Sequence, residues 1–264
     1  MGRPFTFPDR TIVVTGGANG IGYALAERFL AEGAARVVLA DLDGERAAAA
    51  AAELGARAQG YQLDVTDAEA VAALIEEVER DSPIDLWCSN AGVTTGGGLG
   101  SDADWDRTWR VHVLAHVYVA RLLLPRMVER GGGHLLITAS AAGLLTNIDS
   151  APYSVTKHGA VALAEWLAIL HGDEGIDISC LCPMGVNTAM TAKDGPDAAT
   201  RLGGDYLEPE DVAQSVVEAL NEGRFLILPH PKAAVMEQRR ASDRDRWLAG
   251  MRRARARLKG GSGR

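Results

Sequence analysis

The chain has 264 residues, of which 47% are apolar, and it carries a formal net charge of −8. A chain of this length buries roughly 75% of its extended surface, so we expect a globular protein with a substantial core. The acidic balance disfavours nucleic acid as the main partner. No apolar run approaches the ~20 residues of a membrane span, so we expect no membrane partner either.

The cysteines and the first residues bear on the location of the protein. Cys88, Cys180 and Cys182 cannot all pair, and the opening MGRPFTFPDR lacks the apolar core of a signal peptide. Both features favour a reducing, cytoplasmic setting. Cys180 and Cys182 would face the same side of a strand, but we expect no metal site there.

Short apolar runs alternate with longer helical stretches along the chain. The predicted strands are residues 10–16, 35–41, 57–65, 85–90, 133–140, 176–183 and 224–229, of which 57–65 is the weakest. The predicted helices are residues 20–32, 44–54, 67–80, 103–130, 152–172 and 209–222. Near-continuous apolar strands that alternate with helices predict an α/β fold, a doubly wound parallel sheet of seven strands flanked by helices.

No Pro-, Gly- or Ser-rich linker divides the chain, so we expect one domain over residues 1–230 and a C-terminal helical extension over 231–264. Residues 239–264 hold ten Lys or Arg and two Asp, a net charge of +8, which leaves −16 on residues 1–238. The extension could be a docking arm. A solvated helix that packs on an acidic neighbour is the interpretation we favour.

The first predicted strand leads into TGGANGIG, residues 15–22, directly before a helix. Glycines at positions 16, 20 and 22 would let the backbone approach a pyrophosphate, which then lies at the positive N-terminus of the helix. The spacing is G-x-x-x-G-x-G, and a glycine turn alone is weak evidence. Asp41 ends the second strand nineteen residues after Gly22, where an acid that binds the adenosine ribose belongs, so together they predict a Rossmann-like dinucleotide site.

Polar residues also follow the C-terminal ends of the later strands, where ligands of open α/β sheets bind. They are Asp64-Val65, Asn90-Ala91-Gly92, Ser140, and the segment CPMGVNT at 182–188. Taken singly, each has an ordinary explanation: Asp64 as a helix cap, Asn90 as a turn former and Ser140 as a strand-end hydroxyl.

The helix predicted from residue 152 carries Tyr153 in its first turn and Lys157 four residues later, on the same face. A free phenol has a pKa near ~10, which is too high for a base at neutral pH. A neighbouring ammonium would favour the phenolate. Tyr153 could then exchange a proton with an alcohol or carbonyl oxygen, which Ser140 would hydrogen-bond.

In order and spacing, residues 8–230 resemble the short-chain dehydrogenases/reductases, through their TGxxxGxG and YxxxK motifs. The resemblance implies that Ser140, Tyr153 and Lys157 are catalytic and that Lys157 also binds the nicotinamide ribose. It implies a larger set of cofactor-binding residues: Gly16, Asn19, Gly20, Ile21, Gly22, Asp41, Leu42, Asp64, Val65, Asn90, Ala91, Gly92, Tyr153, Lys157, Pro183, Val186 and Thr188.

The expected cofactor is NAD rather than NADP. Asp41 can accept hydrogen bonds from both adenosine ribose hydroxyls, and its carboxylate would repel a 2′-phosphate. Leu42 and Asn19 offer no positive charge to offset that repulsion, and Asp43 adds negative charge, although Arg46 could reach across from the following helix. The alternative is that Asp41 only caps the helix that begins near residue 44.

His112 departs from the pattern of the family, which usually has an asparagine there that holds a water between the lysine and solvent. Histidine titrates near neutrality, so His112 could be a catalytic member of the proton relay. Alternatively, it packs within its helix while a main-chain carbonyl binds the water. His116 lies one turn away, but no acidic or cysteine side chain accompanies the pair, so no metal site is predicted.

The sequence therefore predicts an NAD(H)-dependent oxidoreductase that transfers a hydride between nicotinamide and a hydrophobic secondary alcohol or ketone. A catalytically weak cofactor-binding regulator or scaffold is the main alternative, and reduction of an activated C=C bond is a narrower one. The predicted pocket is mostly apolar, with residues 188–206 as a flexible flap over it. Its expected lining is Leu144, Leu145, Asn147, Met184 and Met190. The family also implies a homo-oligomer, a dimer or homotetramer, formed through helices 103–130 and 152–172.

Overall fold

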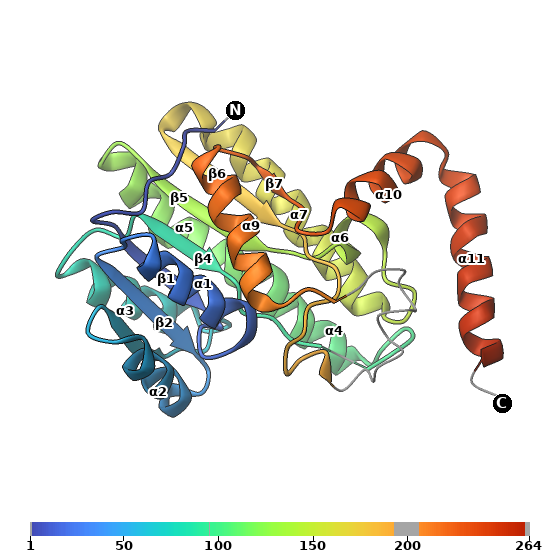
Figure 1. The fold of residues 1–264 in the computed structure, drawn as a ribbon, viewed down its shortest axis with the longest axis horizontal. Coiled ribbons are helices and arrows are strands. Elements are labelled where there is room, and N and C mark those ends of the chain that lie inside the picture. Colours follow the sequence, from blue (N-terminus) through green and yellow to red (C-terminus); the bar gives the residue numbers. More distant parts are fainter. Residues whose placement is uncertain (1, 95, 193–205, 262–264) are drawn as a thin grey trace.

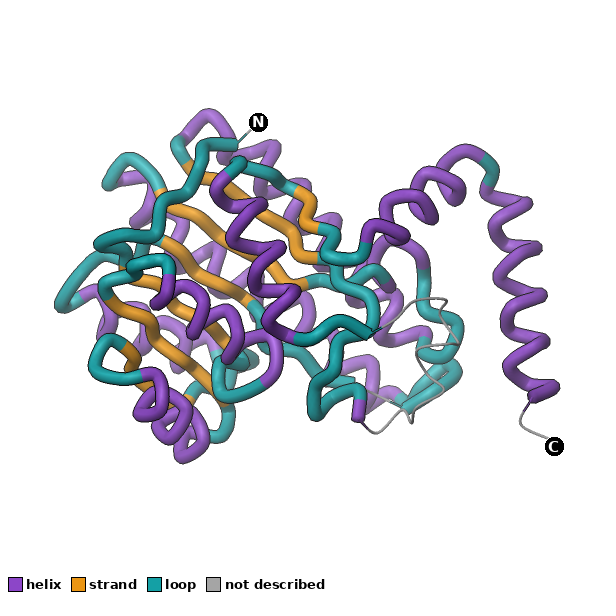
Figure 2. The backbone as a smooth tube through the Cα atoms, viewed as in Figure 1, coloured by secondary structure: helices purple, strands orange, loops and turns teal. Residues whose placement is uncertain are grey.

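The computed structural model describes residues 2–94, 96–192 and 206–261. A twisted sheet forms the centre and carries helices on both faces, while the last two helices, α10 and α11, extend away from it (Figure 1). Coloured by secondary structure, the strands form a single layer between helices (Figure 2). The predicted doubly wound α/β architecture is therefore confirmed.

The sheet has seven parallel strands in the order β3-β2-β1-β4-β5-β6-β7. The order reverses between β1 and β4, and ligands of such sheets bind outside the strand ends at that point. The strands are β1 (Thr11–Thr15), β2 (Arg36–Asp41), β3 (Ala58–Gln62), β4 (Leu86–Ser89), β5 (Gly133–Thr138), β6 (Ile176–Leu181) and β7 (Leu226–Ile227). The edge strands β3 and β7 are shorter than the predicted 57–65 and 224–229.

Two apolar cores lie on opposite faces of the sheet, because successive side chains of a strand point to opposite sides. Val13 of β1 packs with α3 (Ala68–Glu79), α5 (Ala115–Glu129) and α7 (Ala151–His171). Its neighbours Ile12 and Val14 pack with α1 (Gly20–Ala31), α2 (Gly44–Leu54) and α9 (Pro209–Asn221). Both faces of the strands are buried, which explains their near-continuous apolar sequence.

The predicted helix 103–130 is divided into three parts in the structure. α4 (Asp102–Trp109) and α5 are joined by a π-helical turn, η1 (Arg110–Leu114), in which the Ala115 N–H donates to the Arg110 carbonyl oxygen. The turn contains His112, and π-turns of this kind occur frequently at functional sites. By length and composition alone residues 102–129 could cross a membrane, but half of the apolar window is buried inside the protein, as in a core helix.

The C-terminal extension consists of α10 (Pro231–Ser242) and α11 (Arg244–Gly261), and the extended backbone of Asp243 separates them. On α11 the side chains of Arg252, Arg253 and Arg255 are exposed, whereas Trp247 and Met251 are half-buried. We call α10 and α11 together the C-terminal arm.

Candidate functional site

A cavity of about 380 Å³ opens at the C-terminal ends of the strands and collects the predicted cofactor residues. All of them line it: Gly16, Asn19, Gly20, Ile21, Gly22, Asp41, Leu42, Asp64, Val65, Asn90, Ala91, Gly92, Tyr153, Lys157, Pro183, Val186 and Thr188. The sequence missed further lining residues, including Leu63, Val93, Val111 and Thr138. Leu63, Val93 and Val111 each lie next to a predicted site residue in the sequence. Thr138 is the last residue of β5.

The glycine turn at the start of α1 has no room for side chains. Gly16 has a φ of +63°, which favours glycine. A Cβ on Gly22 would overlap the Gly16 carbonyl oxygen, so the start of α1 lies directly against the end of β1. The N-terminus of α1 lies at the cavity, which Asn19, Gly20 and Ile21 line, and a helix N-terminus is a position that suits a pyrophosphate.

Asp41 and Asp64 do not cap the helices that follow them. The N-caps of α2 and α3 are Asp43 and Asp67, whose side chains accept backbone N–H bonds from their own helices. The Asp41 carboxylate instead accepts the Ala18 N–H at 3.1 Å and the Asp43 N–H at 3.3 Å, which holds it beside the glycine turn. The geometry therefore favours the ribose-binding interpretation of Asp41 over the capping one.

Asn90 joins the ends of β4 and β1. Its backbone N–H and that of Ala91 donate to the Thr15 hydroxyl oxygen at 2.9 and 3.0 Å, and its side-chain amide donates to the Thr15 carbonyl oxygen at 3.0 Å. The hydrogen bonds fix the backbone of residues 90–92 across the end of β1, where the strand order reverses.

Ser140 and Tyr153 approach the cavity from two different elements. Ser140 follows β5, and its Oγ accepts the Ala142 N–H at 3.0 Å and donates to the Pro183 carbonyl oxygen over a long 3.5 Å. Ser150 caps α7 by accepting the Tyr153 N–H at 3.3 Å, which sets Tyr153 in the first turn. The weak outgoing bond leaves the Ser140 hydroxyl able to turn toward a bound oxygen.

Lys157 lies one turn further along α7 and is only 3% exposed. Its Nζ donates to the Thr138 carbonyl oxygen at 2.9 Å and lies 5.9 Å from the centre of the Tyr153 ring. Burial lowers the pKa of Lys157 to about 8, because the charged form loses its hydration. The ammonium therefore remains the main form at neutral pH, close to the phenol.

His112 is fully buried, and both of its ring nitrogens are occupied. Nε2 accepts the Val93 N–H at 3.1 Å, while Nδ1 lies 3.0 Å from the Thr156 hydroxyl, which itself donates to the Pro152 carbonyl oxygen. This pattern requires a neutral ring with its proton on Nδ1. Burial and the nearby charge of Lys157 also lower the pKa of His112 well below its usual value.

The ring of His112 packs edge-on against that of Tyr153, with centroids 5.5 Å apart. A neutral ring with both nitrogens engaged is suited to holding the phenol and the loop after β4 in place. Of the two interpretations of His112, packing within the helix therefore fits the geometry better than proton relay.

The thiols and histidines near Lys157 form no recognisable metal site. Cys180 and Cys182 are both buried on β6 and the residue after it, with their sulfurs 3.8 Å apart. Within residues 2–94, 96–192 and 206–261, no three His, Cys, Asp or Glu side chains gather as metal ligands would.

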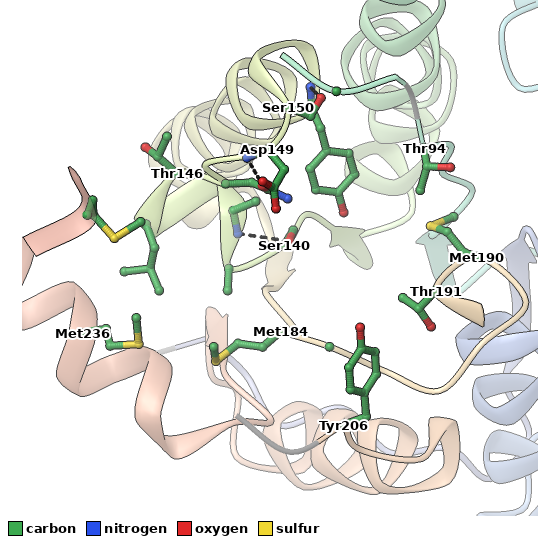
Figure 3. A pocket seen from close by; sticks show the side chains of 18 residues that line it. Thr94, Ser140, Thr146, Asp149, Ser150, Met184, Met190, Thr191, Tyr206 and Met236 are labelled. Carbon is green, nitrogen blue, oxygen red and sulfur yellow. Dashed lines mark hydrogen bonds between the residues drawn. The ribbon is translucent and has the colours of Figure 1, made fainter. Parts of the chain in front are cut away.

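A second cavity, of about 400 Å³, adjoins the first, and Ser140, Tyr153, Met184, Met190 and Thr191 line both. In Figure 3, Ser140 and Met184 lie near the middle of the view, with Met190 and Met236 on opposite sides. Leu145 and Asn147 line it as predicted, whereas Leu144 does not and packs in the core, so that prediction is wrong. Residues 193–205 of the predicted flap lie outside the described residues.

Sequence reasoning missed His230, which precedes α10 and joins it to the loop after β6. Its Nδ1 accepts the Met184 N–H at 3.2 Å, so its Nε2–H donates to the Gly185 carbonyl oxygen at 3.1 Å. The sequence also did not associate Met236 and Met251 of the C-terminal arm with the second cavity. No local pattern marks these three residues, because their partners are far away in the chain.

Comparison with known proteins agrees with this geometry. Residues 10–199 match the family model described as short chain dehydrogenase. The chain belongs to the short-chain dehydrogenase family. It is similar to the 1-deoxy-11-beta-hydroxypentalenate dehydrogenase of Streptomyces exfoliatus, with 38% identity over 86% of this chain and 85% of that protein.

Two further relatives of this short-chain dehydrogenase place it among oxidoreductases. The meso-2,3-butanediol dehydrogenase of Serratia marcescens is 36% identical over 78% of this chain and 85% of its own. The structure of a short-chain dehydrogenase/reductase from Burkholderia phymatum in complex with NAD is 30% identical and has a TM-score of 0.82. That alignment covers 91% of this chain and 96% of that one.

Proposed function

We propose that this short-chain dehydrogenase transfers a hydride between NAD(H) and a hydrophobic secondary alcohol or ketone, with Tyr153 as the general acid/base. The observation that carries the proposal is the junction of the two cavities at Ser140 and Tyr153. One cavity has the glycine turn and acidic strand end that suit a dinucleotide, and the other is lined by methionines and a leucine. A reacting carbon placed between them would lie beside both side chains.

The residues of the chain have distinct parts in this reaction. A nicotinamide dinucleotide, when bound in the first cavity, supplies the hydride acceptor or donor. Tyr153 takes the proton of the alcohol during oxidation and returns it to the carbonyl oxygen during reduction. Ser140 hydrogen-bonds the same oxygen, and the ammonium of Lys157 stabilises the phenolate of Tyr153. Proton balance is kept because each hydride that leaves the carbon is matched by one proton accepted at Tyr153.

NAD(H) is the proposed cofactor because of the charges around Asp41. Its carboxylate lies beside the glycine turn, where an adenosine ribose would lie. A 2′-phosphate at roughly 4 Å from it would be repelled by about 1 kcal/mol in water and nearer 4 kcal/mol at an effective dielectric of ~20. The solved relative that contains NAD is consistent with this preference.

The proposed substrate is a hydroxyl or carbonyl compound with an apolar body and no phosphate group. Among the described residues that line the second cavity, Asp149 alone is charged, and it is exposed to solvent. A phosphate would find no cation in that lining. The names of two relatives, a hydroxypentalenate dehydrogenase and a butanediol dehydrogenase, both denote substrates that carry hydroxyl groups.

We also propose that the protein is a cytoplasmic homo-oligomer. Exposed apolar side chains lie along α7, including Trp166, Ile169 and Leu170. Monomeric proteins rarely expose a contiguous apolar patch of this kind.

The experiment that tests the proposal measures reduction of NAD⁺ with a panel of secondary alcohols by wild type and Tyr153→Phe. We expect the variant to lose at least 100-fold in kcat, because a general acid/base contributes roughly 10²–10⁴-fold. Binding of NADH should change by no more than a few-fold. Tyr23→Phe is the matched control, because the Tyr23 hydroxyl donates to Glu53 on α2 at 3.5 Å and Tyr23 is not among the described residues that line either cavity. A Tyr153→Phe variant that keeps more than about a tenth of the wild-type rate would exclude the mechanism.

A further inference from the structure

The C-terminal arm contributes side chains to the second cavity. Met236 of α10 and Met251 of α11 line it together with Met184 and Met190 from the loop after β6. The chain has six methionines in all. Four of them therefore meet at one cavity, two from the loop after β6 and one each from α10 and α11, with α9 and β7 between the loop and the arm in the chain. Unbranched, polarisable methionine side chains adapt to irregular apolar ligands, so their concentration here indicates a binding surface rather than incidental packing.

The arm is attached to the rest of the protein at several points. His230, at the start of α10, bridges the backbone of Met184 and Gly185 as described above. Arg240, near the end of α10, donates to His158 Nε2 on α7 at 3.3 Å. Trp247 on α11 is half-buried and packs against the core on the α7 face of the sheet. These contacts hold Met236 and Met251 in place against the cavity instead of leaving them on a free tail.

The cavity is larger than a small alcohol needs. At roughly 30 Å³ for each water, its volume of about 400 Å³ would hold about a dozen water molecules. Met236 lies on the opposite side of the cavity from Met190, with Ser140 between them (Figure 3). A ligand whose oxygen reaches Ser140 and Tyr153 therefore contacts the arm with the part of its body that lies on the Met236 side of the cavity.

We propose that the C-terminal arm forms the distal wall of the substrate pocket, where Met236 and Met251 select a bulky apolar secondary alcohol or ketone over a small one. The inference rests on the proposed function and specifies its substrate class. Small alcohols react without reaching the wall, whereas bulky ones bind through it. The two methionines are thus specificity-determining residues, and they take no part in the hydride or proton transfer.

The test compares cyclododecanol, a large ring alcohol, with butan-2-ol in wild type and the double variant Met236→Ala/Met251→Ala. We expect kcat/KM for cyclododecanol to fall at least tenfold, mainly through a higher KM, while kcat/KM for butan-2-ol stays within twofold. The control is Val235→Ala/Leu248→Ala, which truncates two exposed side chains of the same helices that do not line the cavity. That variant should keep the wild-type preference for the large ring.

Calorimetric titration with cyclododecanone provides a second readout that needs no turnover. Wild type should bind the ketone at least tenfold more tightly than the methionine double variant. The proposal would be overturned by an unchanged preference between the two alcohols, or by an equal loss of kcat/KM on both. It would also be overturned if wild type did not bind the ketone, or if the substitutions left ketone binding unchanged. If wild type binds the ketone yet oxidises no alcohol, the proposed function fails while the pocket wall stands.

Discussion

In the proposed function, cofactor choice depends on the carboxylate of Asp41. Wild type should use NAD⁺ with a kcat/KM at least tenfold above that for NADP⁺, since each 1.4 kcal/mol of repulsion corresponds to a factor of ten. Asp41→Ala should narrow this gap by admitting the phosphate. Steady-state kinetics with both cofactors measure the two ratios. Equal use of both cofactors by wild type would refute the NAD preference, and a variant as selective as wild type would assign the discrimination to another residue.

At the residue scale, the position of a side chain at the cavity could be predicted from sequence where it depends on spacing near one strand–turn–helix unit. The glycines of residues 15–22 and the acid at the end of β2 belong to this class, because their partners are near in the chain or fixed by the sheet. His112 is different. Its two interpretations could not be separated from sequence, since the atoms that decide between them belong to Val93 and Thr156, which lie far from it in the chain.

At the scale of single elements, the outer face of α7 bears on the oligomeric state of the protein. Trp166, Ile169 and Leu170 are exposed by 57%, 84% and 49% and share one face at i, i+3 and i+4 spacing. We predict that wild type is a dimer or tetramer and that Trp166→Glu/Ile169→Glu lowers its mass, because a carboxylate would lose its hydration in a buried contact. Light scattering after size exclusion measures the mass. The control Leu248→Glu should leave the assembly intact, and a monomeric wild type would contradict the prediction.

The apolar periodicity of the sequence predicts some features of the helices and strands but not others. Strand and helix order could be predicted because apolar runs reveal buried strands. The π-helical turn at Arg110–Leu114 could not, because the apolar spacing continues through it while the hydrogen bonding changes. The short α6 (Ala142–Leu145) was not predicted, and the length of the two-residue β7 was overestimated. The lengths of both elements depend on tertiary contacts.

For the whole molecule, buried histidines make stability depend on pH. Burial lowers the pKa of His116 to about 3 and that of His134 to about 4, against ~6.5 in an unfolded chain. Below pH ~6.5 the unfolded state therefore binds more protons than the folded state, so the stability present in full above that pH is lost as the pH falls. Each such group contributes a slope of about 1.4 kcal/mol per pH unit.

We predict that the free energy of unfolding falls steeply between pH 6.5 and 4 and that His134→Gln makes this fall shallower. Glutamine can still donate to the Ser179 hydroxyl, which His134 contacts at 3.0 Å, but it does not titrate. Urea unfolding at a series of pH values gives both slopes. Equal slopes for wild type and variant would show that the unfolded state gains no extra proton at this residue.

Hydride transfer from a carbinol carbon to nicotinamide is the step on which the proposed function of this chain depends. The most direct measurement is mass spectrometry of the NADH formed from a secondary alcohol that carries deuterium on that carbon. Wild type should form NADH heavier by one deuterium, and Tyr153→Phe should form labelled NADH at no more than about a hundredth of the wild-type rate. Unlabelled NADH from the labelled alcohol, or no NADH from any member of an alcohol panel that includes large rings, would contradict the proposed function.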